Sequence, residues 1–185
     1  MSDIEKDPAP VRATNVREKY KDWTVDLIRE DVQKTVFNYS ALMFNWSGDF
    51  NQASLIRSGN AFGCKELFYY GKKKYDKRGS VGTHNYSLVT YIKEFEDFVK
   101  MKEKYSFIGI DNNHNFDCVD MFQYDWKTDK EPLLIFGEEG SGLTEEILLL
   151  CDKIVYIKQF GSVPSLNVAS CATTCFYDLI NKRFV

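Results

Sequence analysis

Along this 185-residue chain, short apolar runs alternate with segments in which apolar residues recur every three or four positions, which predicts strands separated by helices. Short runs rich in β-branched, aromatic and large apolar residues, typical of buried strands, lie at 35–46, 66–70, 87–92, 106–110, 133–136 and 153–157. Apolar residues at the helical spacing of three and four lie at 17–33, 51–62, 95–105, 143–150 and 165–184. This alternation predicts an α/β domain with a mostly parallel sheet, flanked by helices, over residues 35–185.

The N-terminal 34 residues differ in pattern from the rest of the chain. Residues 1–14 contain two prolines and few apolar side chains, so we expect a loose tail before the short helix at 17–33. The segment Met1–Pro10 lacks the apolar core of a secretory signal, and no apolar run approaches eighteen residues. We therefore expect a cytoplasmic protein with no membrane partner.

Composition narrows the function classes. The chain has 24 lysines and arginines against 27 aspartates and glutamates, and the resulting net charge of −3 excludes a uniformly basic coat for nucleic acid. One basic segment stands out within 71–78, formed by Lys72, Lys73, Lys74, Lys77 and Arg78. The five cysteines form no CxxC pair, and the chain has two histidines, so we expect buried reduced thiols and no metal site.

Ligands of parallel sheets bind beyond the carboxyl ends of the strands. Candidate site residues are therefore expected in three polar segments that follow strands, which we call junctions. In the first, 48–63, Asn51 is expected to cap the helix and Gly63 to end it, while Arg57 offers a rigid fork of donors that suits a phosphate. The alternative for Arg57 is a surface side chain that covers apolar neighbours.

The second and third junctions follow the strands at 133–136 and 153–157. Segment 136–144 carries three glycines, which let a backbone approach a ligand closely, although it is also compatible with a plain tight turn. It is not a P-loop, because Leu143 stands where that motif requires lysine. In the third junction, Ser165 is expected to cap the last helix and Asn167 to lie just inside it, which is also the pattern of an ordinary helix start.

Together, the three junctions resemble the three ordered motifs of the SpoU family of RNA ribose 2′-O-methyltransferases, within the SPOUT superfamily. The matching positions are Asn51, Arg57, Phe62 and Gly63; then Gly137, Glu139, Gly142, Leu143 and Thr144; then Ile157, Gly161, Ser165, Leu166, Asn167 and Val168. Segment 78–82 also resembles the family's sequence between the first two motifs. The chain departs from the family pattern at Ala53, a position that is usually glycine, and at Lys158–Gln159, which replaces Pro-Met.

The resemblance implies a fold, a cofactor and a set of site residues. The C-terminal segment would form a deep trefoil knot that binds S-adenosylmethionine without a metal, with Gly137, Gly142, Ile157, Gly161 and Leu166 around the cofactor. Arg57 matches the residue that activates the ribose 2′-hydroxyl. Asn51 and Glu139 would fix Arg57 and the substrate. Ser165 and Asn167 would shape the knot and the receiving pocket.

The partners implied are structured RNA and a second copy of the chain. We expect the basic segment at 71–78 to contact RNA phosphates, although a solvated loop is the alternative. The absence of room for a large separate RNA-binding domain favours tRNA over rRNA. By resemblance, a homodimer would form through the knot and the last helix. The competing hypotheses are a non-catalytic RNA-binding or assembly protein on the same knotted fold, and a flavodoxin-like nucleotide-binding module.

Overall fold

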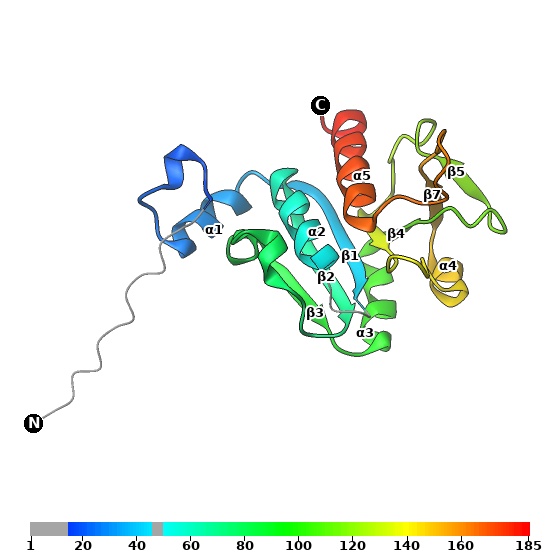
Figure 1. The fold of residues 1–185 in the computed structure, drawn as a ribbon, viewed down its shortest axis with the longest axis horizontal. Helices are drawn as coiled ribbons and strands as arrows, with labels where there is room; N and C mark the ends of the chain where they lie inside the picture. The colour runs from blue at the N-terminus through cyan, green and yellow to red at the C-terminus, as the bar shows by residue number, and fades with distance from the viewer. Residues whose placement is uncertain (1–14, 46–49) are drawn as a thin grey trace, which may run out of the picture.

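The computed structural model describes residues 15–45 and 50–185, and it confirms the predicted parallel α/β sheet (Figure 1). The described chain contains a seven-stranded sheet in the order β3-β2-β1-β6-β4-β7-β5, and every pair of neighbouring strands is parallel. The strands are β1 (Phe37–Asn45), β2 (Cys64–Gly71), β3 (Val89–Ile92), β4 (Tyr105–Ile110), β5 (Cys118–Asp120), β6 (Glu131–Phe136) and β7 (Lys153–Tyr156).

Helices cover both faces of the sheet, which is why its central strands are almost wholly apolar. The helices are α1 (Val25–Gln33), α2 (Phe50–Ala61), α3 (Phe95–Lys100), α4 (Glu145–Leu150) and α5 (Val168–Arg183), with 3-10 turns η1 (Glu18–Tyr20), η2 (Lys77–Ser80), η3 (Thr83–Asn85) and η4 (Met101–Glu103). Along β1, Ala41 and Met43 pack with α2 and α5, whereas Leu42 and Phe44 pack with α3 and α4. One apolar core therefore lies on each face of the sheet.

Two of the differences from the sequence prediction have local causes. The helix expected at 17–33 is interrupted, because the Thr24 side chain accepts a hydrogen bond from the Leu27 amide and starts α1 at Val25. Strand β5 was not predicted, since three residues are too few to show a period; it is a sheet edge beside β7. The tail expected at 1–14 and Trp46, the last residue of the first predicted strand, lie outside the described residues.

The parallel topology gathers the three junctions at one edge of the sheet. All strands end at that edge, and β1, β6, β4 and β7 are adjacent in this order. The segments after β6, β4 and β7 therefore lie at the same edge, where ligands of such sheets bind. The trefoil knot stays a prediction. Among the described residues, no helix has the length and apolar character needed to cross a membrane.

Candidate functional site

Three polar side chains from the three junctions meet at the carboxyl edge of the sheet. The Asn51 amide donates to Glu139 Oε2 at 2.7 Å. The Asn167 amide donates to the same Oε2 at 2.8 Å and to Asn51 Oδ1 at 2.9 Å. We call these three residues the polar triangle. It joins α2, the loop after β6 and the start of α5, so it fixes their relative positions.

The structure corrects two predicted helix caps. Ser165 does not cap the last helix: α5 begins at Val168, because Asn167 Oδ1 accepts hydrogen bonds from the Ala169 and Ser170 amides. Asn51 does not cap its helix either, since it lies inside α2, where its side chain is engaged by Glu139. Asn167 thus combines two roles, with its oxygen holding the helix and its nitrogen holding the triangle.

Asn167 therefore allows a test of the triangle by stability. We expect Asn167→Ala to lower the free energy of unfolding by about 1 kcal/mol through loss of the cap. Asn167→Asp keeps the cap but replaces the amide donor with a second carboxylate against Glu139, so its free energy of unfolding at pH 7 should be lower than that of wild type. Thermal unfolding at pH 7 measures this. An Asn167→Asp variant as stable as wild type at pH 7 would show that the triangle does not form.

A cavity of about 380 Å³ opens on one side of the triangle. Its walls come from the segments after β4, β6 and β7. Of the residues predicted for the cofactor or the pocket, the lining includes Gly137, Glu139, Gly142, Ile157, Ser165 and Leu166. Gly161 lies outside this lining; it is exposed, and a Cβ at that position would meet no atom within 4 Å.

The loop after β6 forms a wall of this cavity in which two backbones touch. A Cβ at Gly137 would lie 2.2 Å from the carbonyl carbon of Gly142, so no other residue fits there. The loop is closed by a hydrogen bond from the Gly142 amide to the Glu138 carbonyl at 3.0 Å. Gly142 has φ +65°, a conformation that favours glycine.

Asp111 is a site residue that sequence reasoning did not single out. Its carboxylate accepts hydrogen bonds from the Leu143 amide at 2.9 Å and from the Asn113 amide at 2.9 Å. It thereby connects the segment after β4 to the glycine loop after β6, and both segments line the cavity. The available signal was the polar run that directly follows β4 at 111–115.

A second cleft, of about 350 Å³, lies on the other side of Asn167. Phe50, Ser54, Arg57 and Ser58 line it from one face of α2, at helical spacing. The facing wall is the first part of α5, held to α2 by a hydrogen bond of 2.7 Å between the hydroxyls of Ser58 and Thr173. The Arg57 side chain is exposed in this cleft, so its guanidinium can meet a ligand.

Arg78 from η2 lines the same cleft, and its side chain is hydrogen-bonded to Asp76. Its guanidinium donates from Nε to both Asp76 oxygens at 3.0 Å, and the Arg78 backbone amide donates to Asp76 Oδ1 at 3.0 Å. These hydrogen bonds hold the pKa of the Asp76 carboxyl at about 2, so the pair stays charged at neutral pH. Arg57 and Arg78 therefore give the cleft two guanidinium groups.

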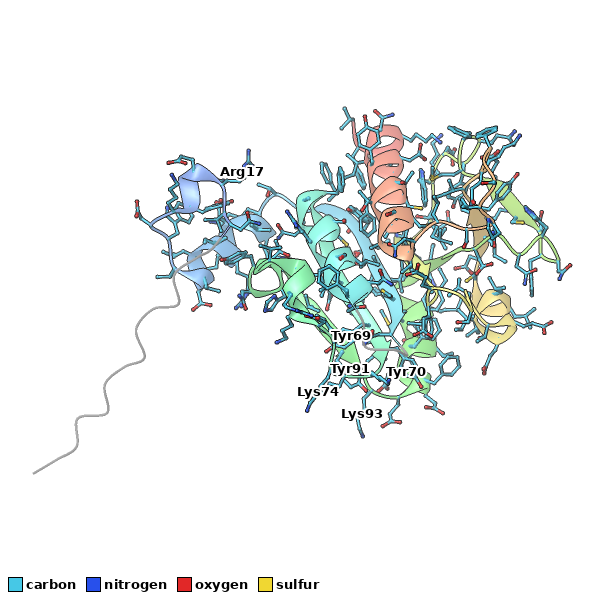
Figure 2. The ribbon with its side chains drawn as sticks, in the orientation of Figure 1. Arg17, Tyr69, Tyr70, Lys74, Tyr91 and Lys93 are labelled. Carbon is cyan, nitrogen blue, oxygen red and sulfur yellow. The ribbon has the colours of Figure 1, made fainter. Side chains whose placement is uncertain are left out.

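The lysines of the basic segment lie elsewhere. Lys72, Lys73 and Lys74 are exposed beyond the end of β2, and neither they nor Lys77 belong to the lining of the cleft. Tyrosines near the ends of β2 and β3 contact the backbone of this loop, and Figure 2 labels Tyr69, Tyr70, Tyr91 and Lys74 in this region. The Tyr69 hydroxyl donates to the Lys73 carbonyl at 3.2 Å, and the Tyr91 hydroxyl donates to the Gly71 carbonyl at 2.9 Å. Tyr69 is itself buried, so it supports the loop and its ring is not available to stack on a base.

This parallel sheet, with a glycine loop and two polar junctions at its carboxyl edge, defines a class of α/β ligand-binding domain. The model of the SpoU rRNA methylase family matches residues 40–177. The chain therefore belongs to the SpoU family, which confirms the resemblance of the three motifs. The matched range contains the polar triangle, both arginines of the cleft and the glycine loop.

Two characterised relatives are similar over most of the chain. A 23S rRNA (uridine(2479)-2′-O)-methyltransferase of Streptomyces viridochromogenes is 32% identical over 144 residues, 72% of this chain and 49% of that protein. The chain thus spans about half the length of that relative. A tRNA (guanosine(18)-2′-O)-methyltransferase of Aquifex aeolicus is 24% identical over 161 residues, 84% of this chain and 75% of that protein.

A solved structure shares the fold. The SpoU methyltransferase AviRb from Streptomyces viridochromogenes, crystallised in complex with the cofactor AdoMet, superposes with a TM-score of 0.67 at 28% identity. The match covers 83% of this chain and 64% of that one. In the described residues, no group of three or more His, Cys, Asp or Glu side chains is placed to hold a metal ion.

Proposed function

We propose that this protein transfers a methyl group from S-adenosylmethionine (AdoMet) to a ribose 2′-hydroxyl of RNA. One observation carries the proposal: a cavity with a glycine-loop wall and a cleft with two arginines meet at the polar triangle. A cofactor in the cavity and a nucleotide in the cleft would face each other there. The names of both relatives, which specify 2′-O-methyl transfer to RNA, support the reaction class.

The cavity fits AdoMet on two features of this chain. Its glycine loop exposes backbone where a Cβ at Gly137 would collide, so planar and hydroxyl groups can approach closely. Gln159, on the cavity wall, has a buried amide oxygen that accepts no hydrogen bond from the residues the structure describes, as expected where the partner is a ligand. Backbone groups of Gly137, Ile157 and Leu166 would hold the adenosine half. The bound cofactor supplies a methyl group on a sulfonium, which is electrophilic without a metal.

Arg57 is assigned to the substrate hydroxyl and the phosphate beside it. A guanidinium almost never loses its proton, so its role is to orient the 2′-oxygen and to stabilise negative charge that develops on it. Asn51 and Glu139 hold the start of α2 against the glycine loop, which keeps Arg57 on the cleft side of the triangle. Ser165 contributes to the cavity wall and Asn167 to the boundary between the two spaces.

The proposed partners are RNA and a second copy of the chain. The two relatives are named for rRNA and tRNA, so the preference for tRNA stays a prediction. Dimerisation through α5 is proposed from the family resemblance. Outside the arginine cleft, α5 presents Thr174 and Tyr177, which are exposed in a single copy. Analytical ultracentrifugation of the full chain measures the oligomeric state.

The reaction is tested by incubating the full chain with methyl-labelled AdoMet and separate tRNA and rRNA fractions, followed by nucleoside mapping. We expect label in a 2′-O-methyl nucleoside from one of the fractions, and AdoMet binding by isothermal titration with no added metal. Label on a base would contradict the ribose assignment. AdoMet binding without transfer to any RNA fraction would favour the non-catalytic alternative.

The lysine loop makes a separate prediction about RNA affinity. Replacing Lys72, Lys73 and Lys74 by alanine should weaken RNA binding. It should also lower the magnitude of the slope of log K against log salt by roughly 2, because fewer phosphate contacts form and fewer counterions are released on binding. AdoMet affinity should not change, since the loop is outside the cavity. A matched variant that replaces the exposed Lys21, Lys100 and Lys127 removes the same charge from other elements. Equal salt slopes for the two variants would show that the loop does not contact RNA.

A further inference from the structure

Phe50 is an exposed aromatic side chain inside the arginine cleft. It is the first residue of α2, its side chain is 51% exposed, and it lines the cleft together with Arg57 and Arg78. An aromatic ring exposed in a cleft that also holds two guanidinium groups is available to a planar group of a ligand. Val81, 40% exposed, lies in the same lining, so the cleft has an apolar floor as well as its cations.

The ring is held by the backbone of η2. A Cβ at Gly79 would lie 3.0 Å from Cε1 of Phe50 and 3.1 Å from its Cδ1, so glycine leaves the space in which one edge of the ring rests. Asp76 anchors the same turn through the Arg78 amide, and the Ser80 hydroxyl, which is buried, donates to the Lys77 carbonyl at 2.8 Å. The ring and the Arg78 guanidinium thus lie at one hydrogen-bonded turn.

We propose that Phe50 is the stacking platform for the base of the nucleotide that enters the cleft, an inference that rests on the proposed RNA methyl transfer. An aromatic ring stacks on any base, and neighbouring arginines bind the flanking phosphates. The spacing of Phe50, Ser54 and Arg57 on one helix face places these two functions along the same wall.

The proposal also defines the class of substrate. Within a duplex, both faces of each base are covered by its neighbours, so a paired and stacked nucleotide cannot offer a face to Phe50. The nucleotide taken into the cleft must therefore lie in a loop, a bulge or a single strand. A continuous helix would bind through its phosphates alone.

Short RNA containing 2-aminopurine tests the platform directly, because stacking quenches the fluorescence of this base. We expect a single-stranded heptamer with central 2-aminopurine to bind the full chain with quenching, and a fully paired duplex to bind with an affinity that does not depend on Phe50. Phe50→Leu should raise the Kd of the heptamer on the order of 10-fold and abolish the quenching. Phe50→Trp should retain both. Phe122→Leu, which removes a 65% exposed phenylalanine after β5, is the matched control and should behave as wild type.

The outcomes separate this inference from the proposed reaction. AdoMet titration confirms that each variant is folded, since Phe50 does not line the cofactor cavity. If Phe50→Leu binds and quenches like wild type, or if it weakens binding of the duplex as much as binding of the heptamer, the platform is wrong even where methyl transfer is observed. If wild type shows Phe50-dependent quenching but labels no RNA, the platform stands and the methyl-transfer proposal fails.

Discussion

Replacing Arg57 by alanine is expected to lower the rate of methyl transfer by about 100- to 1000-fold while leaving AdoMet affinity unchanged. The loss should appear in kcat, because contacts to the 2′-oxygen strengthen as negative charge develops on it. AdoMet affinity should hold because Arg57 lines the arginine cleft and not the cofactor cavity. Single-turnover transfer to the mapped RNA measures the chemical step, and titration calorimetry measures the cofactor.

Two further variants sharpen this experiment. Arg57→Lys should restore little of the rate, since a point charge cannot reproduce the planar fork of donors. Arg17→Ala removes another exposed arginine, outside both the cleft and the cavity, and should keep the full rate. Near-wild-type turnover by Arg57→Ala would show that the assignment of this residue is wrong, and the chemistry would then have to be sought at Glu139 or Ser165.

Replacing Gly137 by alanine should abolish AdoMet binding. The added Cβ would lie 2.2 Å from the Gly142 carbonyl carbon and 2.6 Å from the Leu143 nitrogen, both of which are backbone atoms that cannot rotate away. The loop must therefore open, which breaks the Leu143 bond to Asp111 and removes a wall of the cavity. We expect at least a 100-fold loss of AdoMet affinity by titration, with a lower thermal midpoint, because the hydrogen bonds of the Gly142 and Leu143 amides depend on this loop.

Gly161→Ala is the matched control for this prediction. The position is exposed, a Cβ there meets no atom within 4 Å, and it lies outside the cavity lining. AdoMet affinity and thermal stability should both remain close to wild type. If Gly161→Ala weakens AdoMet as strongly as Gly137→Ala, the cofactor reaches the third junction beyond the cavity described above. If Gly137→Ala still binds AdoMet like wild type, the glycine loop is not its binding wall.

The cation sites divide into two kinds with different expected effects. Arg57 and Arg78 lie in the cleft, and Asp76 fixes the position of Arg78. Lys72, Lys73 and Lys74 are exposed side chains beyond β2. The cleft arginines should therefore affect the chemical step and the placement of one nucleotide, whereas the lysines should affect overall affinity and its dependence on salt. The sequence presented Arg78 and the lysines as one basic segment.

Sequence periodicity by itself determined the sheet and most of its helices. The run 133–136 is apolar throughout, and 106–110 is nearly so, because both faces of each central strand are covered, and this signal is local to each strand. The three motifs were also local, so their order along the chain was sufficient to indicate the SpoU family. Gly63 was correctly placed at the end of α2, where φ +61° requires a residue that adopts this conformation easily.

The tertiary structure alone decided what the polar residues do. Asn51, predicted as a cap, is bound by Glu139 and Asn167, which lie 88 and 116 residues away along the chain, and no local pattern encodes such contacts. The same holds for Asp111, whose function depends on the Leu143 amide 32 residues further on. Phe50 carries no local signal of a ligand site, because Gly79 and the two arginines share its surroundings only in the folded chain. Burial and helical period are properties of a segment, whereas a site is a property of segments that meet only in the folded chain.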